Sequence, residues 1–585
     1  CGEICFNGPL ASARGVEKMA AAMKTRGPDG KGVVFRQHWA LGHRRLKIID
    51  LSQRAEQPMV DSHLGLSIVY NGAVYNYREL RAELAAKGYR FFSDGDTEVI
   101  LKAYHAWGSG CVRRLNGMFA FAVVHRDEPR IFLARDRLGI KPLYYTAGPE
   151  GLRFASTLPA LAAAGGLDTT IDPAALHHYM SFHSVVPAPR TIWAGVRKLP
   201  PAATLEAAPG QMRQEIYWDL PFGPRGEEAD LSFDQWRERL TAALDTAVRR
   251  RLEADVPVGV LLSGGVDSSL VVALLAGSGQ AGLETFSIGF EGVDDQPGDE
   301  FIYSDRVARH FGTDHHRIRI GTDETLDTLD ATLTAMNEPM VSHDCIGFYL
   351  LSREVARHVK VVLSGQGADE VFAGYHWYPP LLEAADPVDA YARGFFDRRH
   401  GAYAQAVDAR LVAGDYSTAF VKSHFDQPGA PTALDKALRL DTTVMLVEDP
   451  VKRVDNMTMA WGLEARVPFL DHELVELAAR IPNRHKVAEG GKHILKAAAR
   501  PLLPAAVVDR PKGYFPVPAL KYLRGPFLEF VRAVLTGEGL RRRRIFNPRY
   551  IDRLLAAPDD QLTPLGGSKL WQMAVLGRWL ELHQT

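Results

Sequence analysis

One segment of the chain combines glycines, serines and a carboxylate in a spacing that suits nucleotide phosphates. The apolar stretch 256–262 is followed by Ser263-Gly264-Gly265-Val266-Asp267-Ser268-Ser269, where a helical pattern begins. Backbone N–H groups of such a glycine turn can surround a phosphate at the positive end of a helix. Because no Gly-Lys-Ser/Thr follows, the turn is not a Walker loop, and Asp267 offers a carboxylate suited to Mg²⁺. The segment predicts a pyrophosphate site.

A second glycine-rich turn follows another apolar stretch, 359–363. It reads Ser364-Gly365-Gln366-Gly367-Ala368-Asp369-Glu370 and places two acids together. Ligands gather at the carboxyl ends of the strands of α/β sheets. The same edge of the expected sheet is therefore the candidate ligand site for both turns.

Cys1 is the other residue with distinctive chemistry. A cysteine at a chain start permits N-terminal nucleophile chemistry, because a free α-amine with a pKa of about 8 can act as base for its own thiol. A terminal cysteine is weak evidence alone, so its neighbours decide.

The elements that must position Cys1 are short strands with turn residues between them. Up to about Trp218 the pattern predicts an α+β sandwich with helices at 77–87 and 97–106. The expected strands are 32–35, 66–71, 120–125, 131–134, 143–145 and 152–155.

The two glycine turns belong to a second domain with a different pattern. Residues 221–231, rich in Pro, Gly and acids, are the expected linker, and Ser232 with Gln235 forms a capping box that opens a helix over 233–253. Strands at 256–262, 284–289 and 359–363 and helices at 268–276 and 303–311 predict a doubly wound α/β sheet. From about residue 380 the chain is mainly helical, and Arg541 to Arg544 is expected to be a solvated helix end.

Size and composition limit the possible functions. A chain of 585 residues with 46% hydrophobic residues, a net charge of −1 and a pI near 7.1 predicts a soluble protein of at least two domains. Nucleic acid is not an expected partner, and the absence of a long apolar run argues against a membrane. Four cysteines (Cys1, Cys5, Cys111, Cys345) favour the reducing cytoplasm. A homodimer is compatible with the sequence.

The first turn resembles the pyrophosphate loop of ATP pyrophosphatases, and the second resembles a motif of asparagine synthetases. Further matches to that family are Leu463-Glu464-Ala465-Arg466-Val467-Pro468-Phe469-Leu470-Asp471, Gly491-Lys492-His493 and Arg510-Pro511-Lys512-Gly513. Taken alone, Arg466 and Asp471 predict a structural ion pair.

The resemblance implies roles for the residues around ATP. Asp267 and Asp369 would hold Mg²⁺, and Lys512 would neutralise the adenylate and the departing pyrophosphate. Gln366 and Glu370 would contact the acceptor; Gln366 stands where the family has a carboxylate, which speaks against plain asparagine synthesis because an amide is no base. The implied ATP site comprises Leu262, Ser263, Gly264, Gly265, Asp267, Ser268, Ser269, Ile288, Ser364, Gly365 and Lys492.

The first half resembles class II glutamine amidotransferases. The matching segments are Arg26-Gly27-Pro28-Asp29, His43-Arg44-Arg45-Leu46, Asn71-Gly72, Gly95-Asp96-Thr97-Glu98, Asn116-Gly117-Met118-Phe119-Ala120 and Arg135 to Tyr145. The resemblance implies that Arg45 pairs with the α-carboxylate of glutamine and Asp96 with its α-ammonium, while Asn71 and the Gly72 N–H form an oxyanion hole. Ala73 replaces a family Glu, so glutamine is expected to be held differently.

Two interpretations of Cys1 stay open. In one, Cys1 is the glutaminase nucleophile. In the other, Cys1-Gly2-Glu3 matches the fourth to sixth residues of a Cys-Gly-Ile-Cys-Gly-Glu start, so the true nucleophile is missing from this chain and Cys1 is a bystander. A Cys1 sulfur directed away from Asn71 and Gly72 would oppose the first interpretation.

The resemblance also implies the architecture. We expect an N-terminal nucleophile αββα sandwich with glutaminase function over residues 1–220, a linker at 221–231, and an ATP-pyrophosphatase-type α/β synthetase domain with added helices over 232–585. Ammonia would pass between the two sites through a closed passage.

Finer details are similar to N-acetylglutaminylglutamine amidotransferases, which amidate an acetylated dipeptide as an osmoprotectant. These are Gln366, His343-Asp344, Tyr375-His376-Trp377-Tyr378-Pro379-Pro380 and Ser184-Val185-Val186-Pro187-Ala188-Pro189-Arg190. That family implies an acyl adenylate that ammonia from glutamine converts to an amide. The alternatives are asparagine synthesis from aspartate, an ammonia-only synthetase, a more remote β-lactam synthetase, and a non-catalytic sensor of glutamine or nucleotide.

Overall fold

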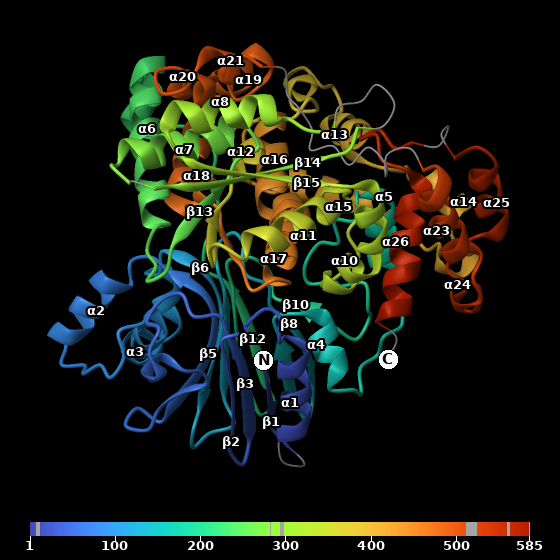
Figure 1. Ribbon diagram of the computed structural model, residues 1–585. Coiled ribbons are helices and arrows are strands. Elements are labelled where there is room, and N and C mark those ends of the chain that lie inside the picture. Colours follow the sequence, from blue (N-terminus) through green and yellow to red (C-terminus); the bar gives the residue numbers. More distant parts are fainter. Residues whose placement is uncertain (8–11, 281, 293–297, 511–522, 559–561, 584–585) are drawn as a thin grey trace.

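The computed structural model describes the chain apart from residues 8–11, 281, 293–297, 511–522, 559–561 and 584–585 (Figure 1). Lys512 therefore lies outside the described residues. The model has a lower β-rich half, formed by the beginning of the chain, and an upper, more helical half. No helix among the described residues is long and apolar enough to cross a membrane.

The lower half is built on two six-stranded antiparallel sheets. The first sheet has the order β10 (Arg197–Lys198), β8 (Tyr144–Gly148), β9 (Gly151–Ala155), β1 (Gly2–Cys5), β3 (Trp39–Arg45) and β2 (Gly30–Phe35). The second has the order β12 (Gln211–Ile216), β11 (Ala203–Ala208), β7 (Ile131–Arg135), β6 (Gly117–His125), β5 (Leu66–Val74) and β4 (Met59–Asp61).

Helices cover the outer face of each sheet, so the lower half has the predicted αββα layers. Apolar side chains such as Ile4, Leu41 and Leu133 fill the space between the sheets. α1 (Ala13–Ala22) and α4 (Leu158–Ala163) pack on the first sheet, and α2 (Tyr77–Ala86) and α3 (Asp96–Trp107) lie against the second. The alternation of side chains along each strand separates these cores.

The linker packs against the upper half and leads directly into a capped helix. The Phe222 N–H donates to the Gly429 carbonyl (2.9 Å), and η3 (Gly226–Asp230) presents Glu228 to Arg480. α6 (Phe233–Arg250) then begins at Ser232, and both hydrogen bonds of the capping box with Gln235 are present, as predicted. The helix ends at Arg250, before the predicted residue 253. The Glu253 carbonyl does not belong to the helix and instead accepts a hydrogen bond from Arg466 of β17.

The upper half contains a five-stranded parallel sheet. Its order is β15 (Asp314–Ile320), β14 (Glu284–Phe290), β13 (Val258–Leu261), β16 (Val361–Leu363) and β17 (Glu464–Arg466). One face packs against α7 (Val266–Gly277), α6, α18 (His472–Arg480) and α20 (His493–Ala499), and the other against α11 (Asp344–Val355) and α17 (Lys452–Met459). The earliest strand is central, so the carboxyl ends of β13, β14 and β16 meet at one edge.

Helices of the C-terminal part surround a segment that comes from the first half. α5 (Pro173–Ser181) lies beside α15 (Tyr416–Phe425) and α26 (Lys569–Leu582) (Figure 1). The Tyr179 hydroxyl donates to the Gln572 carbonyl at 2.7 Å, and the Trp193 and Trp579 rings lie 5.3 Å apart. The basic run at 541–544 ends α24 (Glu538–Arg543), as predicted.

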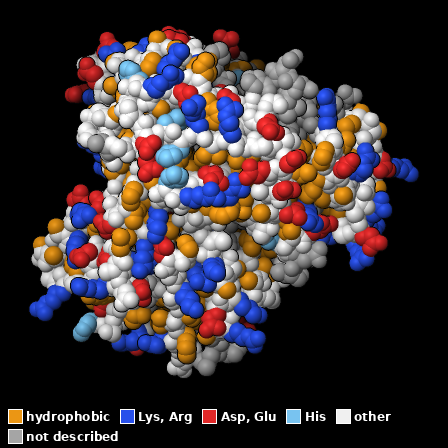
Figure 2. Space-filling view, in the orientation of Figure 1, with side chains coloured by type: hydrophobic (Ala, Val, Ile, Leu, Met, Phe, Trp, Pro, Cys, Tyr) orange, Lys and Arg blue, Asp and Glu red, His pale blue; other side chains and the backbone are white. Residues whose placement is uncertain are grey.

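Buried ion pairs join the two halves. Lys198 contacts Glu338 (2.8 Å) and Glu448 (2.5 Å), and all three side chains are at most 3% exposed. Asp455 pairs with Arg26 and Lys141 of the lower half at 2.9 and 3.2 Å. The visible surface, in contrast, mixes both signs of charge without a single-sign patch (Figure 2).

Candidate active sites

The first candidate site is a pocket between the two sheets of the lower half. It brings together all the glutaminase residues predicted from the sequence: Cys1, Arg45, Asn71, Gly72 and Asp96. Arg45 ends β3, Asn71 and Gly72 lie near the end of β5, and Asp96 is the first residue of α3. Three elements that are separate in sequence therefore converge on one pocket.

Asn71 and Gly72, which are predicted to form an oxyanion hole, both line this pocket. Gly72 has a φ of +148°, and a Cβ there would lie 2.0 Å from the Met118 carbonyl oxygen, so no other residue fits. The Asn71 Nδ2 is buried and has no hydrogen-bond partner among the described residues. A buried donor without a partner costs free energy unless a ligand satisfies it.

Arg45 and Asp96 supply opposite charges to the same pocket. The Arg45 guanidinium donates to the carbonyl oxygens of Ser52 (2.8 Å) and Asp50, which fixes its position. Asp96 accepts hydrogen bonds from the Tyr70 hydroxyl (2.8 Å) and the Val74 N–H (3.0 Å). Burial raises the pKa of Asp96 to about 6, because the carboxylate is removed from water. A bound ammonium group would compensate that cost.

The Cys1 thiol faces away from this arrangement. Along β1, Gly2 and Ile4 face the second sheet, because a Cβ on Gly2 would meet Leu41 and Phe154 of the inter-sheet core. The Cys1 side chain points to the opposite face of the sheet, toward α1. Its Sγ lies 3.4 Å from the Gly42 carbonyl oxygen and 3.9 Å from the Val16 carbonyl oxygen of α1. Burial lowers the pKa of its α-amine to about 5, so the amine is neutral at pH 7. The geometry favours the second interpretation of Cys1.

The first pocket extends to the upper half. Met459, Glu464 and Arg466 contribute to its wall. Arg466 is fully buried, and its Nε donates to Glu464 at 2.9 Å. The predicted pair of Arg466 with Asp471 is wrong, because Asp471 instead pairs with Arg251 at 2.6 Å. Arg466 ends β17 and lies in the pocket wall, whereas Asp471 is the N-cap of α18 and faces the end of α6.

The second candidate site is a cavity of about 980 Å³ at the carboxyl edge of the parallel sheet. Of the residues predicted for ATP, acceptor and metal, those that line it are Leu262, Ser263, Gly265, Asp267, Ser268, Ile288, Ser364, Gly365, Gln366, Asp369 and Lys492. Gly264, Ser269 and Glu370 lie behind the wall. Gly264 packs against α8 (Phe301–Phe311), and Ser269 is fully buried within α7.

The two glycine turns pack directly on one another. Gly264 has a φ of +75°, and a Cβ there would lie 2.6 Å from the Ser304 backbone nitrogen. A Cβ on Gly365 would lie 3.0 Å from the Ser268 nitrogen and 3.1 Å from the Asp267 Cβ. The glycines therefore allow both turns to approach the same point at the start of α7.

Asp267 and Asp369 converge on one cation. The Lys492 Nζ lies 2.7 Å from Asp267 and 2.8 Å from Asp369, and these two carboxylates raise the pKa of Lys492 well above its usual value. Carboxylate oxygens beside a phosphate-binding turn are the donors that Mg²⁺ prefers, so this pair fits the metal. Gly374 makes the approach possible, since a Cβ there would lie 2.4 Å from the Lys492 Cε.

The remaining wall of the cavity was only partly foreseen. The Tyr375 hydroxyl donates to Glu370 at 2.6 Å, and burial together with Asp369 raises the pKa of Glu370 to about 7. Arg453 lies between Asp344 (3.4 Å) and Asp449 (3.5 Å), and was missed. The sequence did contain a signal for Arg453, because Asp449 and Arg453 are opposite charges four residues apart in an otherwise buried helical stretch.

Comparisons with known proteins cover both sites. The asparagine synthase family model matches residues 239–581, and a glutamine amidotransferase domain model matches residues 1–218. The chain is 33% identical over 568 residues to asparagine synthetase [glutamine-hydrolyzing] 1 of Bacillus subtilis, covering 90% of this chain and 88% of that protein. It is 33% identical over 596 residues to a putative asparagine synthetase of Mycobacterium tuberculosis (92% and 90% covered) and 30% identical over 526 residues to asparagine synthetase B of Escherichia coli (85% and 78% covered).

Proposed function

The chain belongs to the asparagine synthase family as a glutamine-hydrolysing, amide-forming ligase, and we propose that its acceptor is the C-terminal carboxylate of N-acetylglutaminylglutamine. The product would be the dipeptide amide, an osmoprotectant. ATP and glutamine are the small-molecule co-substrates. A cytoplasmic location, a homodimeric state and the absence of a nucleic-acid partner remain part of the proposal.

The ion pairs of the acidic residues that line the ATP cavity support the proposed acceptor. Every described acid that lines the cavity already has a cationic partner: Asp267 and Asp369 have Lys492, Asp299 has Arg319, Glu300 has Arg510, Asp344 and Asp449 have Arg453, and Asp397 has His183. Aspartate brings an α-ammonium that needs a free anion. An acetylated dipeptide has no ammonium, and the neutral Gln366 on the same wall suits its amides.

The proposed activation step uses the residues around the glycine turns. An oxygen of the acceptor carboxylate attacks the α-phosphorus of ATP, and the bond to the β-phosphate oxygen breaks to release pyrophosphate. The backbone N–H groups of the turn at 263–269 would hold that pyrophosphate, while Asp267 and Asp369 would hold Mg²⁺. Bound Mg²⁺ supplies positive charge to the phosphate oxygens. Lys512, outside the described residues, is proposed to add a further positive charge.

The proposed amidation step uses ammonia from the lower half. Water and glutamine give glutamate and ammonia, with the amide oxygen held by Asn71 and the Gly72 N–H. Ammonia then attacks the acyl carbon, AMP leaves with the bridging oxygen, and a proton is lost from nitrogen. Glu464 and Arg466 of β17 line the glutamine pocket, which supports a passage between the sites at this strand.

ATP–pyrophosphate exchange with candidate acceptors tests the proposal. N-acetylglutaminylglutamine should support exchange at least about tenfold better in kcat/KM than aspartate, equivalent to about 1.4 kcal/mol of selectivity. Gln366→Glu should reduce exchange with the dipeptide, whereas Gln366→Asn, which keeps the amide, should reduce it less.

Asparagine synthesis is the second candidate, because the named relatives at 30–33% identity are asparagine synthetases. If aspartate supports exchange and the dipeptide does not, the acceptor proposal is wrong and the second candidate replaces it. Glutamine-dependent turnover would remain in either case.

A further inference from the structure

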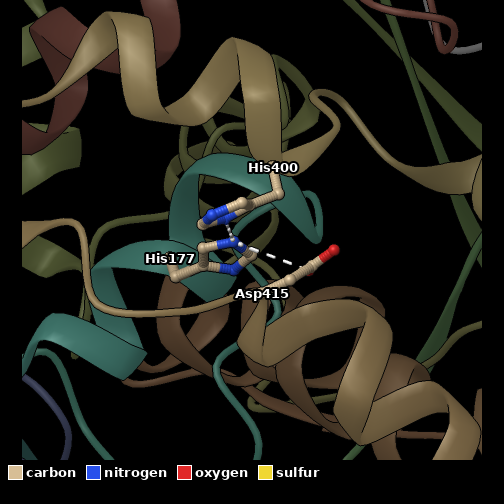
Figure 3. Close-up of side chains that lie close together, drawn as sticks. All are labelled: His177, His400 and Asp415. Carbon is tan, nitrogen blue, oxygen red and sulfur yellow. Dashed lines mark hydrogen bonds and ion pairs between the residues drawn. The ribbon is translucent and has the colours of Figure 1, made fainter.

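A cluster of two histidines and an aspartate lies outside both candidate sites. His177 belongs to α5, His400 is the first residue of α14 (His400–Ala406), and Asp415 is the N-cap of α15 (Figure 3). One ring nitrogen from each histidine and one carboxylate oxygen all lie within 4.8 Å of one another. The three ligand atoms come from three helices, one of which arrives from the first half of the chain.

The distances match the requirements of a small coordination sphere. The His177 Nε2 is 3.1 Å from the His400 Nδ1 and 3.7 Å from the Asp415 Oδ1. In a tetrahedral Zn²⁺ site with bonds of 2.0–2.1 Å, ligand atoms lie about 3.3 Å apart. The two spacings from His177 bracket that value, and the His400 and Asp415 ligand atoms lie within 4.8 Å of each other, so side-chain adjustments would complete three ligand positions. Figure 3 shows the His177 ring below the His400 ring and beside Asp415, with dashed lines from His177 to both.

The surroundings of His177 resemble the second layer of a metal site. Its side chain is 1% exposed, so an ion bound to it would be largely shielded from solvent on this side. The Ser417 Oγ lies 2.9 Å from the His177 Nδ1 and 3.1 Å from the His178 Nδ1. A His177 Nδ1–H that donates to this hydroxyl would leave Nε2 free for the ion.

Metal binding competes with a simpler hydrogen-bonded arrangement. The Ser417 backbone N–H lies 3.3 Å from the His177 Nδ1, which suits the tautomer with its proton on Nε2 and a hydrogen bond to His400. Binding would move that proton to Nδ1 and exchange this N–H contact for one to the hydroxyl. The cost is this N–H contact and the hydrogen bond from Nε2 to His400, whereas two imidazoles and a carboxylate gain a divalent ion.

We propose that His177, His400 and Asp415 bind one divalent cation of the Zn²⁺ class and thereby clamp α5 to α14 and α15. The Asp415 side chain is 39% exposed, which gives an ion access from solvent and leaves a fourth position for water. The clamp fixes the helix that leads into His183, a residue on the wall of the ATP cavity. The bound ion stabilises the join between the two halves of the chain.

Metal titration of the chelator-treated full-length protein tests the site. Calorimetry with Zn²⁺ should show one binding event per chain, and Co²⁺ should give the visible absorption of a four-coordinate site. Zn²⁺ should also raise Tm. His400→Ala and Asp415→Asn should each weaken binding at least about tenfold; Asp415→Asn keeps a side chain able to cap α15, so the fold is preserved.

A second cluster provides the matched control. Ligand atoms of Glu284, His316 and His358 also lie within 4.8 Å of one another, near the amino ends of β14 and β15. His358→Ala should leave Zn²⁺ affinity and the Tm shift unchanged. Undiminished binding in both His400→Ala and Asp415→Asn, loss of binding in His358→Ala, or no binding at about 10 μM Zn²⁺ would each overturn the proposal.

Discussion

Asp96 is the buried carboxylate that we propose to bind the α-ammonium of glutamine. It lies in the pocket with Arg45 and is held by the Tyr70 hydroxyl and the Val74 N–H. Its pKa is raised to about 6 by burial, so protonation below that pH removes the negative charge proposed to meet the glutamine ammonium.

We therefore expect kcat/KM for glutamine to decrease as pH falls below about 6, approaching tenfold per unit, since kcat/KM reports the free enzyme. The measurement is glutamate release from pH 5 to 8. Asp96→Asn should lower kcat/KM throughout and remove this inflection. An unchanged inflection in the variant would assign it to another group.

A second prediction for a single residue concerns Cys1. Because its thiol faces α1 and not Asn71, Cys1 is expected to be a bystander. In a chain extended by Cys-Gly-Ile before Cys1, Cys1→Ala should therefore keep glutaminase activity within about twofold, while Asn71→Ala should lose about 10²–10³-fold. Glutamate release from glutamine measures both. A Cys1→Ala variant as inactive as Asn71→Ala would restore Cys1 as the nucleophile.

Residue types and spacings led to most of the candidate residues but not to their directions. Asn71, Gly72 and Asp96 were recognisable as motif members, whereas the face to which Cys1 points depends on the register of β1 against β3. A shift of one residue would reverse that face. Arg466 shows the same limit: its charge was evident, but its partner Glu464 is set by the path of β17.

Among the helices and strands, the start of a helix with a side-chain cap was the easiest feature to predict from the sequence. Ser232 and Gln235 predicted the start of α6, and short β-type segments between turn residues predicted β5 and β6. β15 was missed because Asp314 to Arg317 are polar in an edge strand, and β17 because three residues carry no period. Tertiary pairing, and not local propensity, forms these two strands.

Ser232→Ala tests the contribution of the cap. Removing it should cost about 1 kcal/mol locally, so amide exchange in the first turn of α6 should become about fivefold faster. Ser232→Asp, which restores an acceptor, should exchange nearly as slowly as the natural protein. Equal exchange rates in all three proteins would show that packing alone sets the start of α6.

At the scale of the whole molecule, the buried charges at the junction tie the two halves into one unit. Lys198 comes from the lower half, and Glu338 and Glu448 come from the upper half. The two halves themselves followed from chain length and from the change of pattern near residue 232. Their contacts did not, because the pairing residues are separated by 140 and 250 positions.

Lys198→Met should therefore destabilise the protein by about 3 to 5 kcal/mol, since it leaves two buried carboxylates with less compensation. Lys198→Met/Glu448→Met removes one charge of each sign, and Lys452 remains near Glu338 (3.9 Å), so most of the loss should be recovered. Thermal and urea unfolding measure both variants. Equal stability of the single and double variants would contradict a coupled network.

The position of α5 also affects the order in which the protein can fold during synthesis. Tyr179 of α5 bonds to Gln572, which is added to the growing chain 393 residues later. At the usual ~5–20 residues per second, a ribosome needs roughly 20 to 80 s to make that stretch. During this interval the apolar face of α5 has no α26 to cover it. The half of the chain that emerges first therefore completes its packing around α5 only when the last helix, α26, has been made.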